Sequence, residues 1–440
     1  MRMITGMNRP QASASQAAMT MYSLRQALRP TRAWSRTLLI VLIVCIAGCS
    51  QQSRCEAGLC PVGTQCDQNT GWCVDADADA PTVPLLMGAY SAVALPGLSR
   101  GYLGYAAREK SLVWIEQTGL QTTTQFIAGP AAGDGADPQG KISHATATSN
   151  GEVHIAWISD GGQTLWYGHR VDGRWTRKRI DAVPPKRAAR TVAIALGQGR
   201  PLVAFEDELT DGVSVAVMSA DGTFEVENVP LPGGPAVKLK GELSFVGGAA
   251  GGTLGMYDAA SGDLLLASRS SSGWKTARFA GHEPDVYSDA GLPVRLGRDL
   301  SGSLLVVWRD RSANEVRVAR SVGGKVQRSV VSDGLYSVPN RQLTRRNVVG
   351  TALSIAVQPT GRVAVGVQDA SQARVFVALE RPNGTFKTLN MPASGRAQYR
   401  PQVLQQVDGS LLVSWLELEP QGSGEGRLTT WALSQPRSEP

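Results

Sequence analysis

The sequence predicts an all-β fold, a seven-bladed β-propeller of four-stranded antiparallel blades that fills residues 85–434. Three registers that recur together along the 440-residue chain predict it. In each copy a bulky residue closes an apolar strand, and an acidic residue follows it within four positions. In six copies a glycine lies six positions before the bulky residue. Registers that agree over many copies identify a repeat architecture. The closing residues are Tyr105, Trp157, Phe205, Tyr257, Trp308, Val367 and Trp415.

Each register has a physical reason. The glycines, such as Gly151 and Gly302, follow a turn residue, and a tight hairpin requires the positive φ that glycine adopts without strain. The strand that follows is apolar on both faces, as in Val153–Ile158, which is typical of a sheet buried on both sides. The residue before the aromatic is mostly small, for example Gly104 and Gly366, so we expect a neighbouring sheet to approach closely there.

The copies are about 50 residues apart, which is close to known propeller periods. Like sheets that cover one another on both faces, arranged radially, form a propeller. The last copy reaches its third strand at Leu428–Ser434 and then ends. We therefore expect the segment Thr82–Met87, before the first copy, to supply the fourth strand and close the ring. A linear solenoid is the alternative, and it would need capping repeats.

The first 48 residues are predicted to be a signal peptide with a long basic leader. A short apolar run, Thr37–Cys49, follows a basic stretch without acids, which is typical of a secretory signal and not of a membrane span. Its ending, Ile46–Cys49, resembles the lipobox of bacterial lipoproteins. The resemblance implies cleavage before Cys49, lipidation of Cys49, and, with Ser50 next, anchoring at the outer membrane, on the periplasmic or the surface side. An ordinary signal with a chance cysteine is the alternative.

Most of the positive net charge of the chain comes from this leader. Residues 1–48 contain six arginines and no acid, so their removal lowers the formal charge from +7 to +1. A net charge this small gives no reason to expect a nucleic-acid partner.

A cysteine-rich stalk is predicted over residues 49–74. In an exported chain, four closely spaced cysteines form a disulfide framework with three possible connectivities. A zinc site is the alternative, but the C-x2-C spacing of zinc knuckles is missing. The segment resembles small EGF-like modules, and that resemblance favours pairing Cys55 with Cys66 and Cys60 with Cys73. An acidic linker, 75–84, precedes the propeller, and a tail, 435–440, follows it.

Two connections between copies are candidate ligand-binding loops. Ser332–Gly350 lengthens one repeat and carries Arg341 and Arg345, and Ala280–Gly291 carries His282 and Asp285. Long loops in compact folds are often functional. A solvated insertion without a ligand is the alternative.

A further set of candidates lies fifteen positions before the closing residue, where the first strand of a copy begins. This register includes Tyr90, Arg190, Glu242 and Arg400. Arginine binds carboxylates in a bidentate manner, so these side chains are predicted to converge on an anionic ligand near the axis. The acids after the second strand could form a carboxylate ring, but such a residue more often accepts backbone N–H groups in its own turn.

The region 85–434 resembles sialidase-type, BNR-like propellers in strand-turn phrases such as HIAWISDGG at 154–162. The Asp-box of that family, S-x-D-x-G-x-T-W, is not matched. The segment Ser159–Trp166 approaches it with the wrong spacing, between the second and third strands, and Ser219–Gly222 is only a fragment of it. The arginine triad and the Tyr–Glu pair of the family cannot be assigned to positions here. The resemblance implies a fold and not an activity.

No metal or cofactor is predicted, because the four histidines, His144, His154, His169 and His282, show no ligand spacing. We expect a monomeric, lipid-anchored binding scaffold without catalytic activity, with a protein or glycan as partner. A sialidase-like glycoside hydrolase or lyase is one alternative and needs two carboxylates roughly 5–10 Å apart. Glu242, Glu283, Asp285 and the acids after the second strands could supply them. A structural subunit of an envelope complex is the other alternative.

Overall fold

The computed structural model describes residues 64–67, 72–75, 85, 86 and 90–433, except 98, 120, 136, 160–163, 234–236, 250, 282–288, 323, 324, 338–343, 393–395 and 419–424. The predicted signal peptide, Cys49, Cys55, Cys60, the greater part of the acidic linker and the tail lie outside these residues, so those expectations stay predictions.

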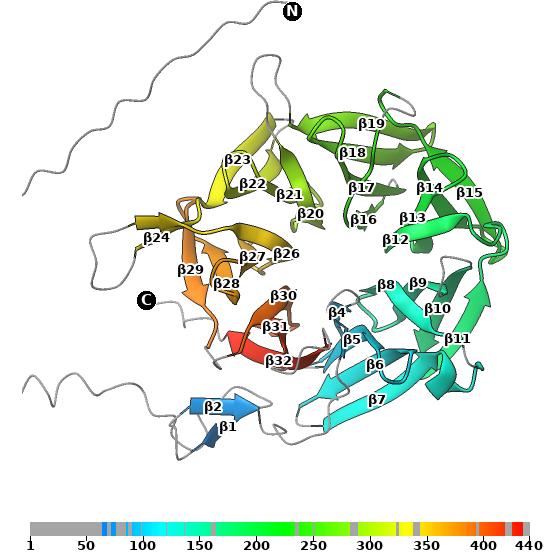
Figure 1. Ribbon diagram of the computed structural model, residues 1–440, viewed down its shortest axis with the longest axis horizontal. Coiled ribbons are helices and arrows are strands. Elements are labelled where there is room, and N and C mark those ends of the chain that lie inside the picture. Colours follow the sequence, from blue (N-terminus) through cyan, green and yellow to red (C-terminus); the bar gives the residue numbers. More distant parts are fainter. Residues whose placement is uncertain are drawn as a thin grey trace, which may run out of the picture. The chain divides into compact units, whose positions relative to one another are not determined.

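The described residues form seven four-stranded antiparallel sheets that stand around an axis (Figure 1). The predicted seven-bladed propeller is therefore confirmed. The only helix among the described residues is the short 3-10 helix η1, Pro130–Ala132. Within that part of the chain, no helix has the length and apolarity needed to cross a membrane.

Blades 1 to 6 each contribute four strands in chain order from the axis outward, and blade 7 does so for its first three strands. Blade 1 consists of β4 (Tyr90–Ala94), β5 (Ser99–Ala106), β6 (Ser111–Thr118) and β7 (Gln121–Ala128). Blade 2 consists of β8 (Gln139–Ala147), β9 (Val153–Ser159), β10 (Leu165–Val171) and β11 (Arg174–Arg179). Blade 3 consists of β12 (Ala188–Gly197), β13 (Arg200–Asp207), β14 (Gly212–Met218) and β15 (Phe224–Val229). Blade 4 consists of β16 (Ser244–Gly248), β17 (Gly251–Asp258), β18 (Asp263–Ser270) and β19 (Gly273–Ala280).

The remaining blades follow the same order. Blade 5 consists of β20 (Ala290–Arg298), β21 (Leu304–Asp310), β22 (Glu315–Val322) and β23 (Lys325–Ser332). Blade 6 consists of β26 (Val349–Val357), β27 (Val363–Asp369), β28 (Arg374–Glu380) and β29 (Phe386–Asn390). Blade 7 consists of β30 (Gln398–Gln405), β31 (Leu411–Leu418), β32 (Glu425–Leu433) and β3 (Leu85–Leu86).

Blade 7 closes the ring as predicted. Its outer strand is β3, which comes from upstream of blade 1 and pairs with β32, Leu85 opposite Gly426. A side-chain hydrogen bond also crosses the closure, because the Tyr90 hydroxyl of blade 1 lies 2.6 Å from Ser414 Oγ of blade 7. Both ends of the propeller sequence thus meet in one region, which a linear stack of repeats would not allow.

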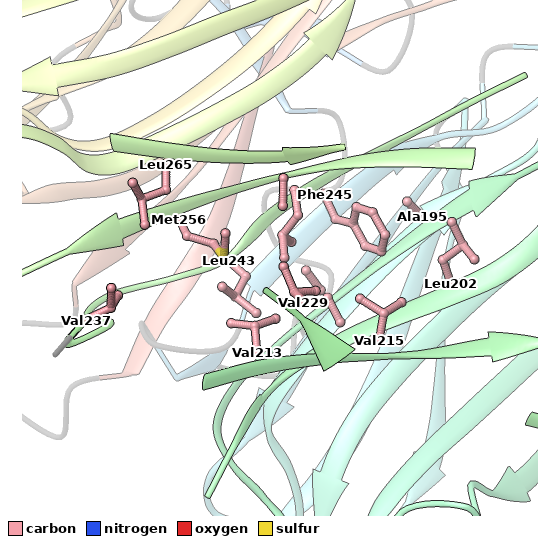
Figure 2. Close-up of a cluster of buried hydrophobic side chains, with 14 residues drawn as sticks. Ala195, Leu202, Val213, Val215, Val229, Val237, Leu243, Phe245, Met256 and Leu265 are labelled. Carbon is pink, nitrogen blue, oxygen red and sulfur yellow. The ribbon is translucent and has the colours of Figure 1, made fainter. Parts of the chain in front are cut away.

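Packing between blades explains the apolar strands. Figure 2 shows a cluster between blades 3 and 4, where Val213 and Val215 of one sheet face Phe245 and Met256 of the next. The closing aromatics, such as Trp308, are almost completely buried. A Cβ at Gly366 would lie 2.8 Å from Val403 of the next blade, so the small residue before the closing position permits the predicted close approach.

Four of the acids after the second strands lie in their own turns. Each of these aspartates accepts a backbone N–H from a residue two or three positions later: Asp207 from Leu209, Asp258 from Ala260, Asp310 from Ala313 and Asp369 from Gln372. In these four blades the contacts explain the recurring acid as turn chemistry, and not as part of a ring of metal ligands.

Two short hairpins stand apart from the blades. One joins β1 (Thr64–Asp67) to β2 (Trp72–Asp75), and it makes Cys66 and Cys73 register partners. The other joins β24 (Leu335–Ser337) to β25 (Thr344–Arg346) and lies within the long connection Ser332–Gly350. The predicted disulfides stay a prediction.

Candidate functional site

The strand order of the blades gives the ring two faces. The first-to-second and third-to-fourth turns of every blade share one face, which we call the turn face. The second-to-third turns and the connections between blades share the other, which we call the loop face. The innermost strands begin at the loop face and contact one another around the axis (Figure 1). The long connections Ser332–Gly350 and Ala280–Gly291 belong to the loop face.

The innermost strands enclose an axial cavity of about 410 Å³. All seven of these strands contribute lining residues. One register of the repeat, thirteen positions before the closing residue, lines the cavity in every blade: Ala92, His144, Val192, Ser244, Arg295, Ser354 and Gln402.

Most polar side chains of this register connect neighbouring blades. Three of them accept a backbone N–H of the next innermost strand: His144 from Ile194 at 3.4 Å, Ser244 from Leu296 at 2.9 Å and Ser354 from Val403 at 3.1 Å. Burial, and then the nearby Arg295, lower the pKa of His144 to about 4, so its imidazole is neutral at pH 7. Arg295 is the only member with a permanent charge, which sets it apart from the structural members.

A second cavity of about 620 Å³ continues the axial one at the loop face, because Glu242 and Arg295 line both. Among the described residues of its lining, five side chains are cationic and only Glu242 is a carboxylate. A concave site with one dominant sign of charge concentrates ligands of the opposite sign. We call this site the cationic mouth, and its charged residues are Lys240, Glu242, Arg295, Arg309, Arg311 and Arg400.

Glu242 forms ion pairs with both Arg295 and Arg400. Burial opposes ionisation of its carboxyl, but the two guanidinium groups outweigh it and lower the pKa of Glu242 to about 2. The side chain is 38% exposed, and the exposed part faces the cavities that it lines. Water there screens the pairs, so their contribution to stability is modest, but the carboxylate stays ionised at any ordinary pH.

Arg400 lies at an irregularity of β30. The pairing with β31 shifts register between Tyr399 and Gln402, and Arg400 has a φ of 52°, which non-glycine residues adopt rarely. Bulges of this kind redirect side chains near functional sites. The innermost strands β8, β12, β20 and β26 shift register at the same stage, so the repeat itself bends these strands at the loop face.

Arg309 is a half-buried cation of the mouth without an ion pair to a described carboxylate. Its buried Nε has no hydrogen-bond partner in the described part of the chain. Burial, and then the neighbouring Arg311, lower the pKa of the Arg309 guanidinium. Arg311, in contrast, forms an ion pair with Asp289 at 3.0 Å, and the Tyr257 hydroxyl donates to the same carboxylate.

The structure brings together only part of the predicted ring. Glu242 and Arg400 meet in the cationic mouth, whereas Tyr90 lines the axial cavity and takes part in ring closure. Arg190 has a side chain that is 76% exposed and lies 3.7 Å from Glu206, outside both cavities. Ligand binding by these residues stays a prediction.

The loop candidates are not placed by the structure. His282, Asp285 and Arg341 lie outside the described residues, and of Arg345 only the backbone is described, in β25 opposite Tyr336. Sequence reasoning missed Arg295, Arg309, Arg311 and Lys240. A count of thirteen positions back from the closing residue, in addition to fifteen, would have found Arg295. Arg309 and Arg311 follow Trp308 by one and three positions, and no register of the repeat distinguished them.

No protein-family model matches the chain, and the curated proteins contain no match. Solved structures similar to it include virginiamycin B lyase from Staphylococcus aureus, with 12% identity, a TM-score of 0.45 and coverage of 75% of this chain and 93% of that one. A fungal lectin from Aleuria aurantia with a six-bladed β-propeller has 11% identity, a TM-score of 0.45 and coverage of 71% and 100%. An α-L-arabinanase from Penicillium chrysogenum has 11% identity, a TM-score of 0.43 and coverage of 66% and 92%. At these identities the likeness concerns the fold, and the activities belong to those proteins.

Proposed function

We propose that the protein is a binding propeller without catalytic activity, which holds an anionic group of a glycan or protein partner in the cationic mouth. The observation that carries the proposal is the excess of cations in a concave site. The lining has five cationic side chains, Glu242 is its one described carboxylate, and Asp289 compensates Arg311. Three positive charges therefore remain for a ligand to neutralise.

Arginine chemistry defines what such a ligand offers. A guanidinium binds carboxylate, sulfate or phosphate oxygens through parallel N–H donors, and these charge-assisted bonds are stronger than neutral ones. Arg309 forms no ion pair with a described carboxylate, and the nearby Asp289 is paired with Arg311, so an anionic group would provide a direct partner. The mouth has room for a ligand, since its cavity of about 620 Å³ is within the range of small-molecule sites.

The same charges argue against hydrolysis. Glycoside hydrolases use two carboxyl groups, of which one must be protonated to act as the acid. Glu242 is the one carboxylate among the described lining residues, and its pKa of about 2 keeps it ionised. Four of the acids after the second strands are held in their own turns, and Glu417 accepts the Trp415 indole N–H. A sialidase-like hydrolase or lyase would therefore rely on Glu109, or on Asp160, Glu283 and Asp285, which lie outside the described residues.

We further propose that the propeller is exported and anchored to the outer membrane through lipidated Cys49, as the lipobox resemblance implies. The cysteine-rich stalk and the acidic linker would then separate the membrane from the propeller. A structural subunit of an envelope complex is compatible with the same arrangement. Co-purification after crosslinking in cells tests that alternative.

A glycan array tests the proposed function. The full chain is applied to sialylated, uronate-containing and sulfated glycans and to their neutral counterparts at two salt concentrations. We expect binding to acidic glycans only, weaker at high salt because ions screen the site, and reduced about tenfold or more in Arg309→Gln, as for a close charge pair. Arg190→Gln, which removes an exposed arginine outside the mouth, is the matched control and should bind normally.

Equal binding of neutral and acidic glycans, or an effect of Arg190→Gln as large as that of Arg309→Gln, would contradict the proposal. If no glycan binds, the same comparison of variants is made with phosphorylated and acidic peptides. Release of sugar from any array component, lost in Glu283→Gln, would establish the hydrolase alternative.

A further inference from the structure

Blade 2 carries a second cluster of polar side chains, distant from the cationic mouth because it lies toward the turn face. Glu152 ends the turn between β8 and β9, His154 lies on β9, and His169 lies on β10. The two histidines are direct register partners across the β9–β10 pair. Side chains of directly opposed residues lie on the same face of a sheet, so the antiparallel pairing places both imidazoles beside the carboxylate.

The distances suit a metal ion. One ligand atom from each of the three residues lies within 4.8 Å of the other two. His169 Nε2 is 3.2 Å and His154 Nε2 is 4.0 Å from Glu152 Oε2. Two ligands that each lie 2.0–2.1 Å from a tetrahedral zinc ion are about 3.3 Å apart. The separation of His169 from Glu152 already suits a zinc ion, whereas that of His154 from Glu152 must shorten by about 0.7 Å.

Outer contacts orient two of the three side chains. The Asn150 amide donates to Glu152 Oε1 at 3.1 Å, which leaves Oε2 toward the imidazoles. The Tyr167 hydroxyl lies 2.7 Å from His154 Nδ1. Metal-binding histidines and carboxylates are usually held in this way through the atom that does not bind the metal. His154 is 5% exposed, so its ring is also fixed by packing.

An ion pair between Glu152 and His169 explains why these two side chains lie together. It does not explain why His154 is buried beside them. The described part of the chain offers His154 Nε2 no hydrogen bond, although the residue is buried. The two imidazoles stack at 4.4 Å with an angle of 12° between their planes. Because an ion lies in the plane of each imidazole that binds it, binding must rotate the more exposed ring, that of His169.

The charge near Glu152 favours a cation. A cavity of about 350 Å³ opens beside Glu152 at the turn face, and its charged residues are Glu116, Glu152, Asp172 and Arg170. Arg170 forms an ion pair with Glu116, so the balance of the cavity is negative. Glu152 lines this cavity, but neither histidine does, so the cavity contributes negative charge near the cluster and not a position on the ion.

We propose that Glu152, His154 and His169 bind a divalent first-row transition metal, with Zn²⁺ as the ion that fits two imidazoles and one carboxylate. The site is independent of the cationic mouth and of its ligand. It places a metal ion at the end of blade 2 that belongs to the turn face.

Titration with Zn²⁺ alone tests this site. The full chain is stripped with a chelator, dialysed and titrated with zinc by calorimetry, with His169→Ala, Glu152→Gln and His144→Asn in parallel. We expect His169→Ala and Glu152→Gln to lose one equivalent of zinc, or to bind it more than about a hundredfold more weakly, since even an outer-contact loss costs about 10- to 100-fold. Tyr167→Phe should weaken the same equivalent about tenfold.

His144→Asn removes an imidazole from the axial cavity and keeps an acceptor for Ile194, so it should bind as the wild type does. The cysteines upstream of the propeller can also bind zinc. The blade 2 site is therefore measured as the difference in bound zinc between the wild type and each variant.

Cobalt substitution gives a second measurement, because a tetrahedral Co²⁺ band should appear in the wild type and be absent in Glu152→Gln. Equal zinc equivalents and affinities in the wild type, His169→Ala and Glu152→Gln would overturn the proposal. If His169→Ala fails to fold, Glu152→Gln, altered in an exposed turn, decides.

Discussion

The two faces of the ring carry opposite chemistry although one repeated unit builds both. At the loop face, the cationic mouth has five cationic side chains around one carboxylate. At the turn face, a cavity between blades 1 and 2 has three acids and one arginine that is already paired, and one of these acids, Glu152, also lies beside a histidine pair. Packing between blades restricts the strand interiors, whereas the strand ends contact fewer neighbours. The repeat thus fixes the scaffold, and function diverges at its two ends.

The largest effect is expected from the closing aromatics, which support both faces. Trp308→Ala in blade 5 and Trp157→Ala in blade 2 should each lower the free energy of unfolding by about 3–5 kcal/mol, because both rings are fully buried. Urea denaturation measures the loss. Trp308→Ala should impair binding of acidic glycans more than binding of zinc, and Trp157→Ala should do the reverse. Equal damage to both sites by either substitution would show that the faces are not independent.

A smaller effect, of opposite sign on stability and binding, is expected for Glu242→Gln. The substitution leaves Arg295 and Arg400 without their shared carboxylate. Loss of one member of a buried pair costs about 3–5 kcal/mol, and with Glu242 38% exposed we expect about 1–2 kcal/mol after solvent screening.

Binding of an acidic glycan to Glu242→Gln should tighten, since the ligand no longer competes with Glu242 for the two arginines. A gain of about tenfold corresponds to the lower end of measured charge-pair couplings. Calorimetry with the strongest acidic glycan from the array measures the change. Weaker binding would mean that Glu242 itself contacts the ligand, and that the mouth does not act as a cationic site.

The smallest effect compares the histidines of the two regions as pH falls. Burial lowers the pKa values of His144 and His154 to about 4 from an ordinary value of 6.5. Between these values the unfolded chain binds more protons than the folded one, so stability is complete above pH 6.5 and decreases toward pH 4. With chelator present, the urea midpoint should fall over this range, and less so in His144→Asn. An identical pH dependence in the two chains would show that His144 is not held neutral by the axial cavity.

Much of the fold followed from the sequence because its signals are local and repeated. The glycine turns, the apolar strands and the closing aromatics each recur at fixed spacing. The missing fourth strand of blade 7 predicted that the segment Thr82–Met87 closes the ring, and Leu85–Leu86 within it does so. Residues that act within one turn, such as Asp258, were also predictable, since an acid after a strand commonly accepts the N–H groups of its own turn.

The site residues were less predictable because they depend on register between strands. Arg295 lines the axial cavity from the regular part of the β20–β21 pairing, opposite Val307, and a count of fifteen positions back from the aromatic passes over it. His154 and His169 are fifteen positions apart, a spacing without meaning for a metal until the β9–β10 register makes them partners. Arg190 is the opposite case. It lies in the predicted register, fifteen positions before the closing residue, but its side chain is exposed and lies outside both cavities.

The central claim, that the cationic mouth recognises the charge of its ligand through Arg309, is tested most directly by a thermodynamic cycle. The affinities of one acidic glycan and its neutral methyl ester or desulfated form are measured by calorimetry for the wild type and Arg309→Gln. A coupling between ligand charge and Arg309 of about 1.5 kcal/mol or more is predicted. If the wild type and Arg309→Gln distinguish the two glycans equally, the account is contradicted.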